Sequence, residues 1–151
     1  MTNSRRVFID DRDLINSIYT DELIRRDESA LRTVIEEMVA RVVQYENEIG
    51  SGEDFIQWFR WSSPVEVQDT ITCLKSIGAT KSAKICEKAI EVAFPLGIPE
   101  SLKLYKEHLY DLESEPANRK QREQLVRLAK KQLAQLNETT GCLASWIREN
   151  Q

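Results

Sequence analysis

Few side chains in this sequence are suited to catalysis. His108 is the only histidine, and Cys73, Cys86 and Cys142 are widely spaced, with no Cys-x-x-Cys pair among them. Nucleophilic sites usually pair a serine or cysteine with a histidine base, and zinc sites need closely spaced cysteine and histidine ligands. We therefore interpret His108 as a residue at the rim of a helix and the cysteines as small hydrophobic residues.

Phosphate-binding motifs are absent as well. The sequence contains neither Gly-x-Gly-x-x-Gly nor Gly-x-x-x-x-Gly-Lys-Ser/Thr, and Gly50 and Gly52 stand between two predicted helices. A phosphate-binding loop instead follows a strand and opens a helix. The sequence predicts no enzymatic activity, no catalytic residue, no metal site and no cofactor.

Carboxylates are the functional groups that this sequence does concentrate. Residues 46–69 contain six acidic residues and one basic residue, Arg60, a net charge of −5. Carboxylates with suitable spacing can compete with the phosphates that dominate the affinity of nucleic acids for proteins. We predict an acidic partner-binding surface made of Glu46, Glu48, Glu53, Asp54, Glu66 and Asp69. The alternative is an ordinary solvated surface.

Basic residues are concentrated elsewhere in the chain. The net charge is −7 over residues 1–70 and +3 over residues 71–151, which gives −4 in total. The main basic segment is 119–131, where six lysines and arginines accompany one acidic residue, Glu123. Three interpretations stay open: a solvated helix face, pairing with the acidic half of a second copy, and direct contact with nucleic acid.

Four aromatic rings lie close together after the acidic residues 53 and 54. Phe55, Trp58, Phe59 and Trp61 occupy seven residues, and in a helix the first three share one face. Such rings bury a large area, so a core anchor is the main interpretation. The alternative is that Trp61 stays partly exposed at a partner surface, where tryptophan is enriched.

These residues must be positioned by helices. Glycine and proline are scarce and separate segments in which apolar residues recur every three or four positions, and no alternating strand pattern occurs. The spacing predicts helices over 11–26, 29–48, 53–61, 64–77, 80–94, 99–113, 116–137 and 142–148. The predicted fold class is all-α, a single-domain irregular bundle of about seven or eight helices.

Local signals mark where several helices begin and end. Ser63, Pro64 and Glu66 form a capping-box sequence that predicts a helix start. Thr80 is predicted to cap the next helix. Turns are predicted at residues 50–52 and at residues 139–141, where glycines follow apolar periodic segments.

Length and composition are those of a soluble globular protein. The chain has 151 residues, 41% hydrophobic and 30% charged, and no apolar run long enough to span a membrane. Residues 1–10 are predicted to be a poorly ordered tail without a signal-peptide core, and 11–151 one helical domain. We therefore expect a cytoplasmic protein without membrane contact.

Several short motifs follow one another in an informative order. Phe55, Gln57, Trp58 and Phe59 belong to the segment Phe-x-Gln-aromatic-aromatic, and Gly78 is the centre of an Ile-Gly-Ala turn. An alanine- and isoleucine-rich helix follows, and then come Phe-Pro at 94–95 and Ile-Pro at 98–99. In this order the motifs resemble the bacterial DNA-mimic protein family over about residues 40–150. Two positions differ, because residues 53–54 replace the family's glycine pair and residue 61 its asparagine.

The resemblance implies a function without catalysis. Its shared residues form an aromatic anchor and a turn, and its acidic surface would occupy the basic groove of a DNA-binding protein and exclude DNA. A homodimer is plausible, with Trp58 or Trp61 and the basic helix as contacts. The alternatives are an immunity-type or other regulatory protein-binding module that uses the same acidic surface, and a nucleic-acid binder through residues 119–131, which is the less expected of the two.

Overall fold

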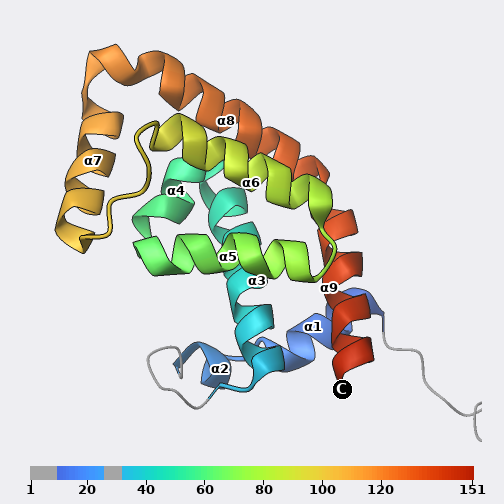
Figure 1. Ribbon diagram of the computed structural model, residues 1–151. Helices are drawn as coiled ribbons and strands as arrows, with labels where there is room; N and C mark the ends of the chain where they lie inside the picture. The colour runs from blue at the N-terminus through green and yellow to red at the C-terminus, as the bar shows by residue number, and fades with distance from the viewer. Residues whose placement is uncertain (1–9, 26–31) are drawn as a thin grey trace, which may run out of the picture.

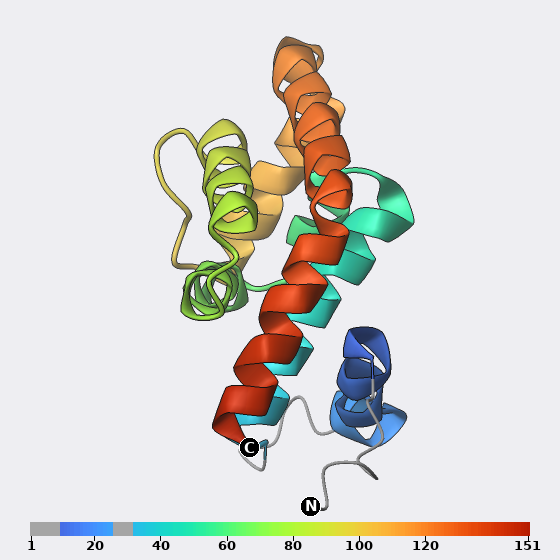
Figure 2. The ribbon, with the colours of Figure 1, turned by 90° about the vertical axis from the view of Figure 1, so that its right-hand side faces the viewer.

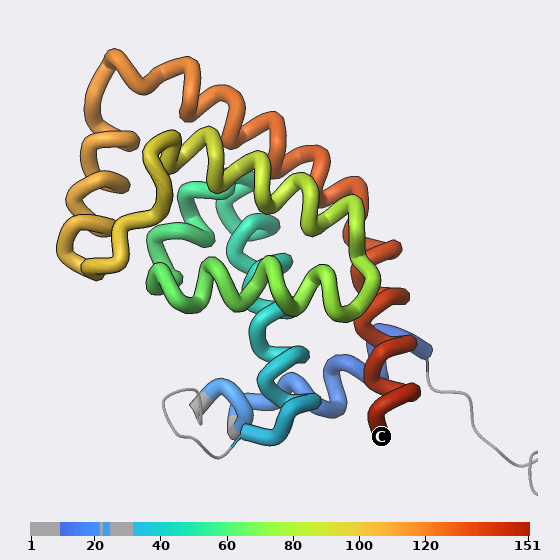
Figure 3. The backbone as a smooth tube through the Cα atoms, viewed as in Figure 1, coloured from blue at the N-terminus to red at the C-terminus, as the bar shows by residue number. Residues whose placement is uncertain are grey.

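The computed structural model describes residues 10–25 and 32–151, which are coloured in the tube of Figure 3. Most of the predicted tail, residues 1–10, and the predicted helix start at residue 29 lie outside the described residues. Asp10 is the first described residue, and it caps the first helix by accepting a hydrogen bond from the backbone N–H of Asp13 at 2.8 Å.

The regular elements of the described ranges are all helical, so the predicted all-α class is confirmed. Many of these helices contribute to one cluster of buried hydrophobic residues. In chain order they are α1 (Asp11–Ile18), α2 (Asp21–Arg25), α3 (Val34–Gly52), α4 (Phe55–Arg60), α5 (Pro64–Ser76), α6 (Thr80–Ala93), α7 (Leu102–Ser114), the 3₁₀ turn η2 (Pro116–Asn118), α8 (Arg119–Ala134) and α9 (Leu136–Asn150).

Helix α3 lies at the centre of the bundle (Figure 1). It packs against α4, α5, α8 and α9, while α6 lies between α5 and α8. Helices α8 and α9 follow each other along one side of the molecule (Figure 2). At the other end α1 packs on α9 and α3. Among the described residues no helix is long and apolar enough to cross a membrane.

The aromatic segment is the centre of the core, as its spacing predicts. Phe55 and Phe59 are completely buried and Trp58 is 2% exposed, whereas Trp61 is 68% exposed. The Trp58 ring meets the ring of Tyr45 edge-on, with 4.9 Å between their centroids. Three rings therefore anchor the core, which removes Trp58 as a homodimer contact, and the fourth ring, that of Trp61, lies on the surface.

Helix starts follow local capping in two places. The Ser63 hydroxyl accepts the backbone N–H of Glu66 at 3.2 Å, and the Glu66 carboxylate accepts the N–H of Ser63 at 2.9 Å, so the predicted capping box is confirmed. Thr33 and Glu36 form a second box at the start of α3. That box explains why α3 begins at residue 34.

The predicted cap at Thr80 is wrong. Ala79 occupies the cap position of α6 and no side chain caps this end. The Thr80 hydroxyl turns back and donates to the carbonyl of Gly78 at 3.5 Å. Gly78, the residue before Ala79, has a φ of 79° and takes the left-handed conformation that follows the end of α5. The cap position of α6 therefore falls on Ala79, and Thr80 is already inside α6.

The predicted turn at residues 50–52 is also wrong, because α3 continues to Gly52. Glu53 takes the left-handed conformation that ends the helix, with a φ of 51°. Gly52 is needed for close approach instead: a Cβ there would lie 3.0 Å from the Cβ of Gln57. The glycine therefore lets α4 fold back tightly onto the end of α3.

Two further boundaries differ from the predictions. The helix predicted over 11–26 is interrupted at Tyr19 and Thr20, where the Thr20 hydroxyl accepts the N–H of Leu23 at 3.2 Å and starts α2. The turn predicted at 139–141 lies inside α9, and the chain bends at Gln135 instead. Thr139 is helical, and its hydroxyl donates to the Gln135 carbonyl at 3.0 Å.

The two candidate caps make a matched pair for a stability test. We expect Ser63→Ala to lower the free energy of unfolding by about 1 kcal/mol, because two helix N–H groups lose their capping arrangement. Thr80→Ala should change it by less than about 0.5 kcal/mol. Urea unfolding followed by circular dichroism measures both. Equal losses for the two variants would contradict the assignment of the caps.

Candidate protein-binding surface

The six predicted acidic residues do not share one surface. Glu46 turns inward from α3, while the other five lie around α4 and α5. The Glu46 Oε1 accepts a hydrogen bond from Gln132 Nε2 at 2.9 Å, and its Oε2 is buried with no hydrogen-bond partner among the described residues. Glu46 therefore belongs to the interior of the bundle and contributes little to a partner-binding surface.

Glu46 lies at one end of a buried hydrogen-bond chain. Tyr45 Oη donates to Gln132 Oε1 at 2.9 Å, and Gln132 Nε2 donates to Ser82 Oγ at 3.0 Å. The hydroxyls of Ser82 and Thr139 share a hydrogen bond of 2.6 Å. Since Thr139 also donates to a backbone carbonyl, Ser82 must be the donor of that pair. The chain joins α3, α8, α6 and α9, and the side chains of Tyr45 and Gln132 are completely buried.

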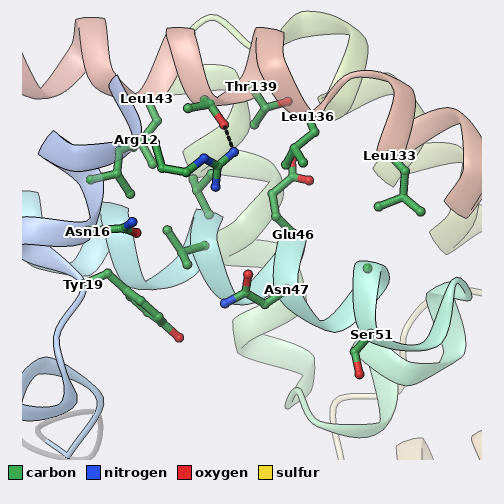
Figure 4. A pocket seen from close by; sticks show the side chains of 15 residues that line it. Arg12, Asn16, Tyr19, Glu46, Asn47, Ser51, Leu133, Leu136, Thr139 and Leu143 are labelled. Atoms are coloured by element: carbon green, nitrogen blue, oxygen red, sulfur yellow. Dashed lines mark hydrogen bonds between the residues drawn. The ribbon is translucent and has the colours of Figure 1, made fainter. Parts of the chain in front are cut away.

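A cleft of about 440 Å³ opens beside Glu46 (Figure 4). Arg12 and Asn16 of α1 and Tyr19, the residue after it, form one wall. Helices α3 and α9 and Leu133 at the end of α8 form the rest. The Arg12 guanidinium donates to the hydroxyl of Thr140 at 3.5 Å, across the mouth of the cleft. The floor is largely aliphatic. Among the described residues that line the cleft, Glu46 is the only carboxylate.

Burial changes the acidity of Glu46. Removal of its carboxylate from water raises the pKa to about 7, and the hydrogen bond from Gln132 and the positive charge of Arg12 oppose this only in part. Near neutral pH the side chain is therefore about half protonated. A half-neutral, inward-facing carboxyl is a poor substitute for a phosphate.

One group of carboxylates surrounds α4. Gln57, a residue of the aromatic motif, donates from Nε2 to Glu48 at 3.2 Å and accepts from Arg60 at 3.0 Å. Arg60 also pairs with Glu113 of α7. The amide of Gln57 thus fixes the position of Glu48 and of the arginine beside it.

Glu53 and Asp54 complete this group at the junction of α3 and α4. The Asp54 carboxylate caps α4 by accepting the N–H of Ile56 at 3.0 Å, and partial burial raises its pKa. Glu53 is exposed. We call Glu48, Glu53, Asp54 and Glu113 the α4 acidic cluster; with Arg60 its net charge is −3.

A second group of carboxylates lies along α5. Arg41 of α3 pairs with Glu66 at 2.8 Å and with Glu37 at 2.9 Å. Asp69 and Glu100 line a cleft of about 400 Å³ between α5 and the segment after α6. We call Glu37, Glu66, Asp69 and Glu100 the α5 acidic cluster. Arg32 also pairs with Glu37 at 3.2 Å, so with Arg41 and Arg32 the net charge of the cluster is −2.

Three members of these clusters were missed by sequence reasoning. Glu37 is recognisable afterwards, because it stands four residues before Arg41 on one helix. Glu100 and Glu113 are distant in sequence from the residues that they join, and nothing local indicates their position. Only the packing of α7 and of the segment before it brings them to α5 and α4.

Exposed apolar side chains adjoin the acidic clusters. Trp61 and Val65 are each 68% exposed, and Val65 lines the same cleft as Asp69. Pro64, Ile98 and Pro99 form the apolar part of that cleft. An apolar patch with carboxylates at its rim is typical of protein-binding surfaces.

His108, Cys73 and Cys86 pack against other groups of the protein. His108 stacks on Phe94, with 4.9 Å between ring centroids, and its Nε2 contacts the carbonyl of Ala93. Burial raises the pKa of Cys73 to about 11 and raises that of Cys86 further. Thiols with raised pKa values are weak nucleophiles at neutral pH. The interpretation of these residues as packing groups agrees with this geometry.

Comparison with known proteins gives one match. The family model described as DMP19-like protein matches residues 30–150. No curated protein and no solved structure matches. The matched range contains α3 to α9 and both acidic clusters, but it leaves out α1. One wall of the cleft beside Glu46 therefore lies outside the matched range.

The raised pKa of Glu46 predicts how the stability of the protein depends on pH. The folded protein keeps a proton on Glu46 that the unfolded chain releases near its ordinary pKa of 4.5, so stability should fall as pH rises from about 4.5 to about 7 and level off above that. In Glu46→Gln this contribution disappears. We expect the variant to match the parent near pH 4.5 and to exceed it by about 2–3 kcal/mol near pH 8.

The measurement is urea unfolding of both proteins across this pH range. Glu53→Gln, an exposed change nearby, is the control and should follow the parent curve. If the difference in free energy of unfolding between the parent and Glu46→Gln did not change with pH, the buried, protonated carboxyl would be refuted.

Proposed function

We infer the function from a premise that the match over residues 30–150 establishes: this chain belongs to the DMP19-like (DNA mimic protein 19-like) family. We propose that it acts without catalysis, by binding a DNA-binding protein through the α4 and α5 acidic clusters. Bound there, it would cover the basic groove of that protein and exclude DNA.

The observation that carries this proposal is that the protein's own side chains hold the carboxylates in place. Arg41 holds two members of the α5 acidic cluster, and Gln57 and Arg60 hold two members of the α4 acidic cluster. A carboxylate that is already fixed loses less conformational entropy when it binds. The α4 acidic cluster keeps a net charge of −3 and the α5 acidic cluster one of −2, so their own cations do not neutralise them.

Glu53, Asp69 and Glu100 are the members best placed for direct contact. All three are exposed, and none has an ion pair among the described residues. Their charges are available to arginines and lysines of a partner. Long-range attraction would speed the encounter and would weaken as salt is added.

A second candidate is an immunity-type or other regulatory module that binds an enzyme. The exposed Trp61 and Val65 beside the α5 acidic cluster favour it, because tryptophan often anchors tight protein interfaces. Both candidates use the same surface. They differ in the identity of the partner, which is a DNA-binding protein in the first case and an enzyme in the second. Either could also involve a homodimer.

Capture of the partner from an extract of the native cells tests this surface. We expect Glu53→Lys, Asp69→Lys and Glu100→Lys together to reduce capture at least about tenfold, since reversed charges repel a basic partner. These positions are chosen because none of them caps a helix, unlike Asp54 and Glu66. Mass spectrometry of the captured protein separates the two candidates.

The matched control reverses three exposed carboxylates away from both clusters, Glu91→Lys, Glu107→Lys and Glu149→Lys. This control variant changes the net charge by the same amount as the first triple variant, and it should still capture the partner. Capture that survives the first triple change, with an unchanged helical circular dichroism signal, would refute the acidic-cluster proposal.

A further inference from the structure

The basic segment predicted at 119–131 is only half of a larger basic surface. Helices α6 and α8 lie side by side along one edge of the molecule (Figures 1 and 2). The side chain of Gln121 donates to the Val92 carbonyl at 2.8 Å, and that of Gln132 donates to Ser82. These two contacts show that the helices are antiparallel. The lysines of α6 therefore adjoin the basic residues of α8.

We call this surface the α6–α8 basic face. Its eight exposed cations are Lys81, Lys84, Lys88, Arg119, Lys120, Arg127, Lys130 and Lys131. Four carboxylates adjoin them, Glu87, Glu91, Glu123 and Glu138, which leaves a net charge of +4. Arg122 does not belong to it, because its guanidinium donates to the carbonyls of Leu112 and Glu115 and closes the turn into α8.

Half of these cations have no ion pair among the described residues: Lys84, Lys120, Lys130 and Lys131. The other four have carboxylate partners at the surface. The Lys81–Glu138 and Lys88–Glu91 separations are both 3.7 Å, and the lysine side chains are 69% and 59% exposed. Such exposed pairs are weak and exchange readily for another anion.

The composition of this face decides which kind of partner fits it. The exposed large hydrophobic residues of the described chain all lie outside α6 and α8. Protein interfaces have an apolar core, which this face lacks. Interfaces with nucleic acid are polar and strongly positive. The two helices also present their cations in rows: by the rise of an α-helix, positions 120 and 131 are about 16 Å apart.

We propose that the α6–α8 basic face binds the phosphate backbone of nucleic acid without reading its sequence. No exposed aromatic residue on α6 or α8 is available to stack on bases, so the contacts are electrostatic. The net charge of −4 does not prevent this, because charges are screened beyond about 8 Å at physiological salt. This surface is separate from the acidic clusters and acts without the protein partner proposed above.

The test is fluorescence anisotropy of the purified full chain with a labelled random duplex of about 20 base pairs, at about 50 mM and about 200 mM salt. We expect binding that weakens with salt. Lys84→Gln, Lys120→Gln and Lys131→Gln together should weaken it at least about tenfold. The triple change should also reduce the slope of log K against log salt by about 2 to 3, about 0.9 for each lost phosphate contact.

The control removes three exposed lysines from other helices, Lys75→Gln, Lys103→Gln and Lys106→Gln. It should retain binding to within about threefold, because only net charge has changed. Circular dichroism checks that both triple variants are folded. The single variants Lys120→Gln and Lys131→Gln repeat the test with a smaller change.

Three results would overturn the proposal. One is the absence of binding at about 50 mM salt, where electrostatic contacts are strongest. Another is equal weakening by the two triple changes, which would reflect net charge alone. The third is self-association in sedimentation that the α6–α8 triple change abolishes, which would identify the acidic surface of a second copy as the occupant.

Discussion

The requirement to satisfy the buried amide of Gln132 constrains the rest of the structure. Its side chain is completely buried and makes hydrogen bonds to Tyr45, Glu46 and Ser82. An unsatisfied polar group at this depth would cost about 1–3 kcal/mol, so α3, α6 and α8 keep the register that aligns these partners. Thr139 extends the same constraint to α9.

This register separates charges of opposite sign. Once α8 is aligned against α3 and α6, its basic residues face outward together with the lysines of α6. The carboxylates of α4 and α5 face other directions, and α7 and the segment before it add Glu113 and Glu100 to them. A chain with a mild net charge therefore presents two acidic clusters and one basic face.

Rigid presentation of charge is the physical basis of the function proposed above. Gln57 and Arg60 of α4, a helix that packs against α3, hold carboxylates near α4, and Arg41 of α3 holds carboxylates near α5. The aromatic motif contributes to this directly: its rings anchor the core, and its glutamine orients a surface carboxylate. Residues of the aromatic motif thus contribute both to the core and to the surface.

Local patterns in the sequence determined the all-α class, the capping box at Ser63 and the burial of the aromatic segment. These features depend on hydrogen bonds and periodicities within a few residues, which a sequence displays directly. Local patterns failed at Thr80 and at Gly52, where a neighbouring turn or helix decided the outcome.

The candidate site depended more on tertiary structure. Only packing decided that Glu46 points inward, that Glu100 and Glu113 join the acidic clusters, and that the lysines of α6 adjoin α8. The physical reason is that burial and charge neighbourhood are set by residues distant in the chain. A helical period tells which residues share a face, but it does not tell what that face meets.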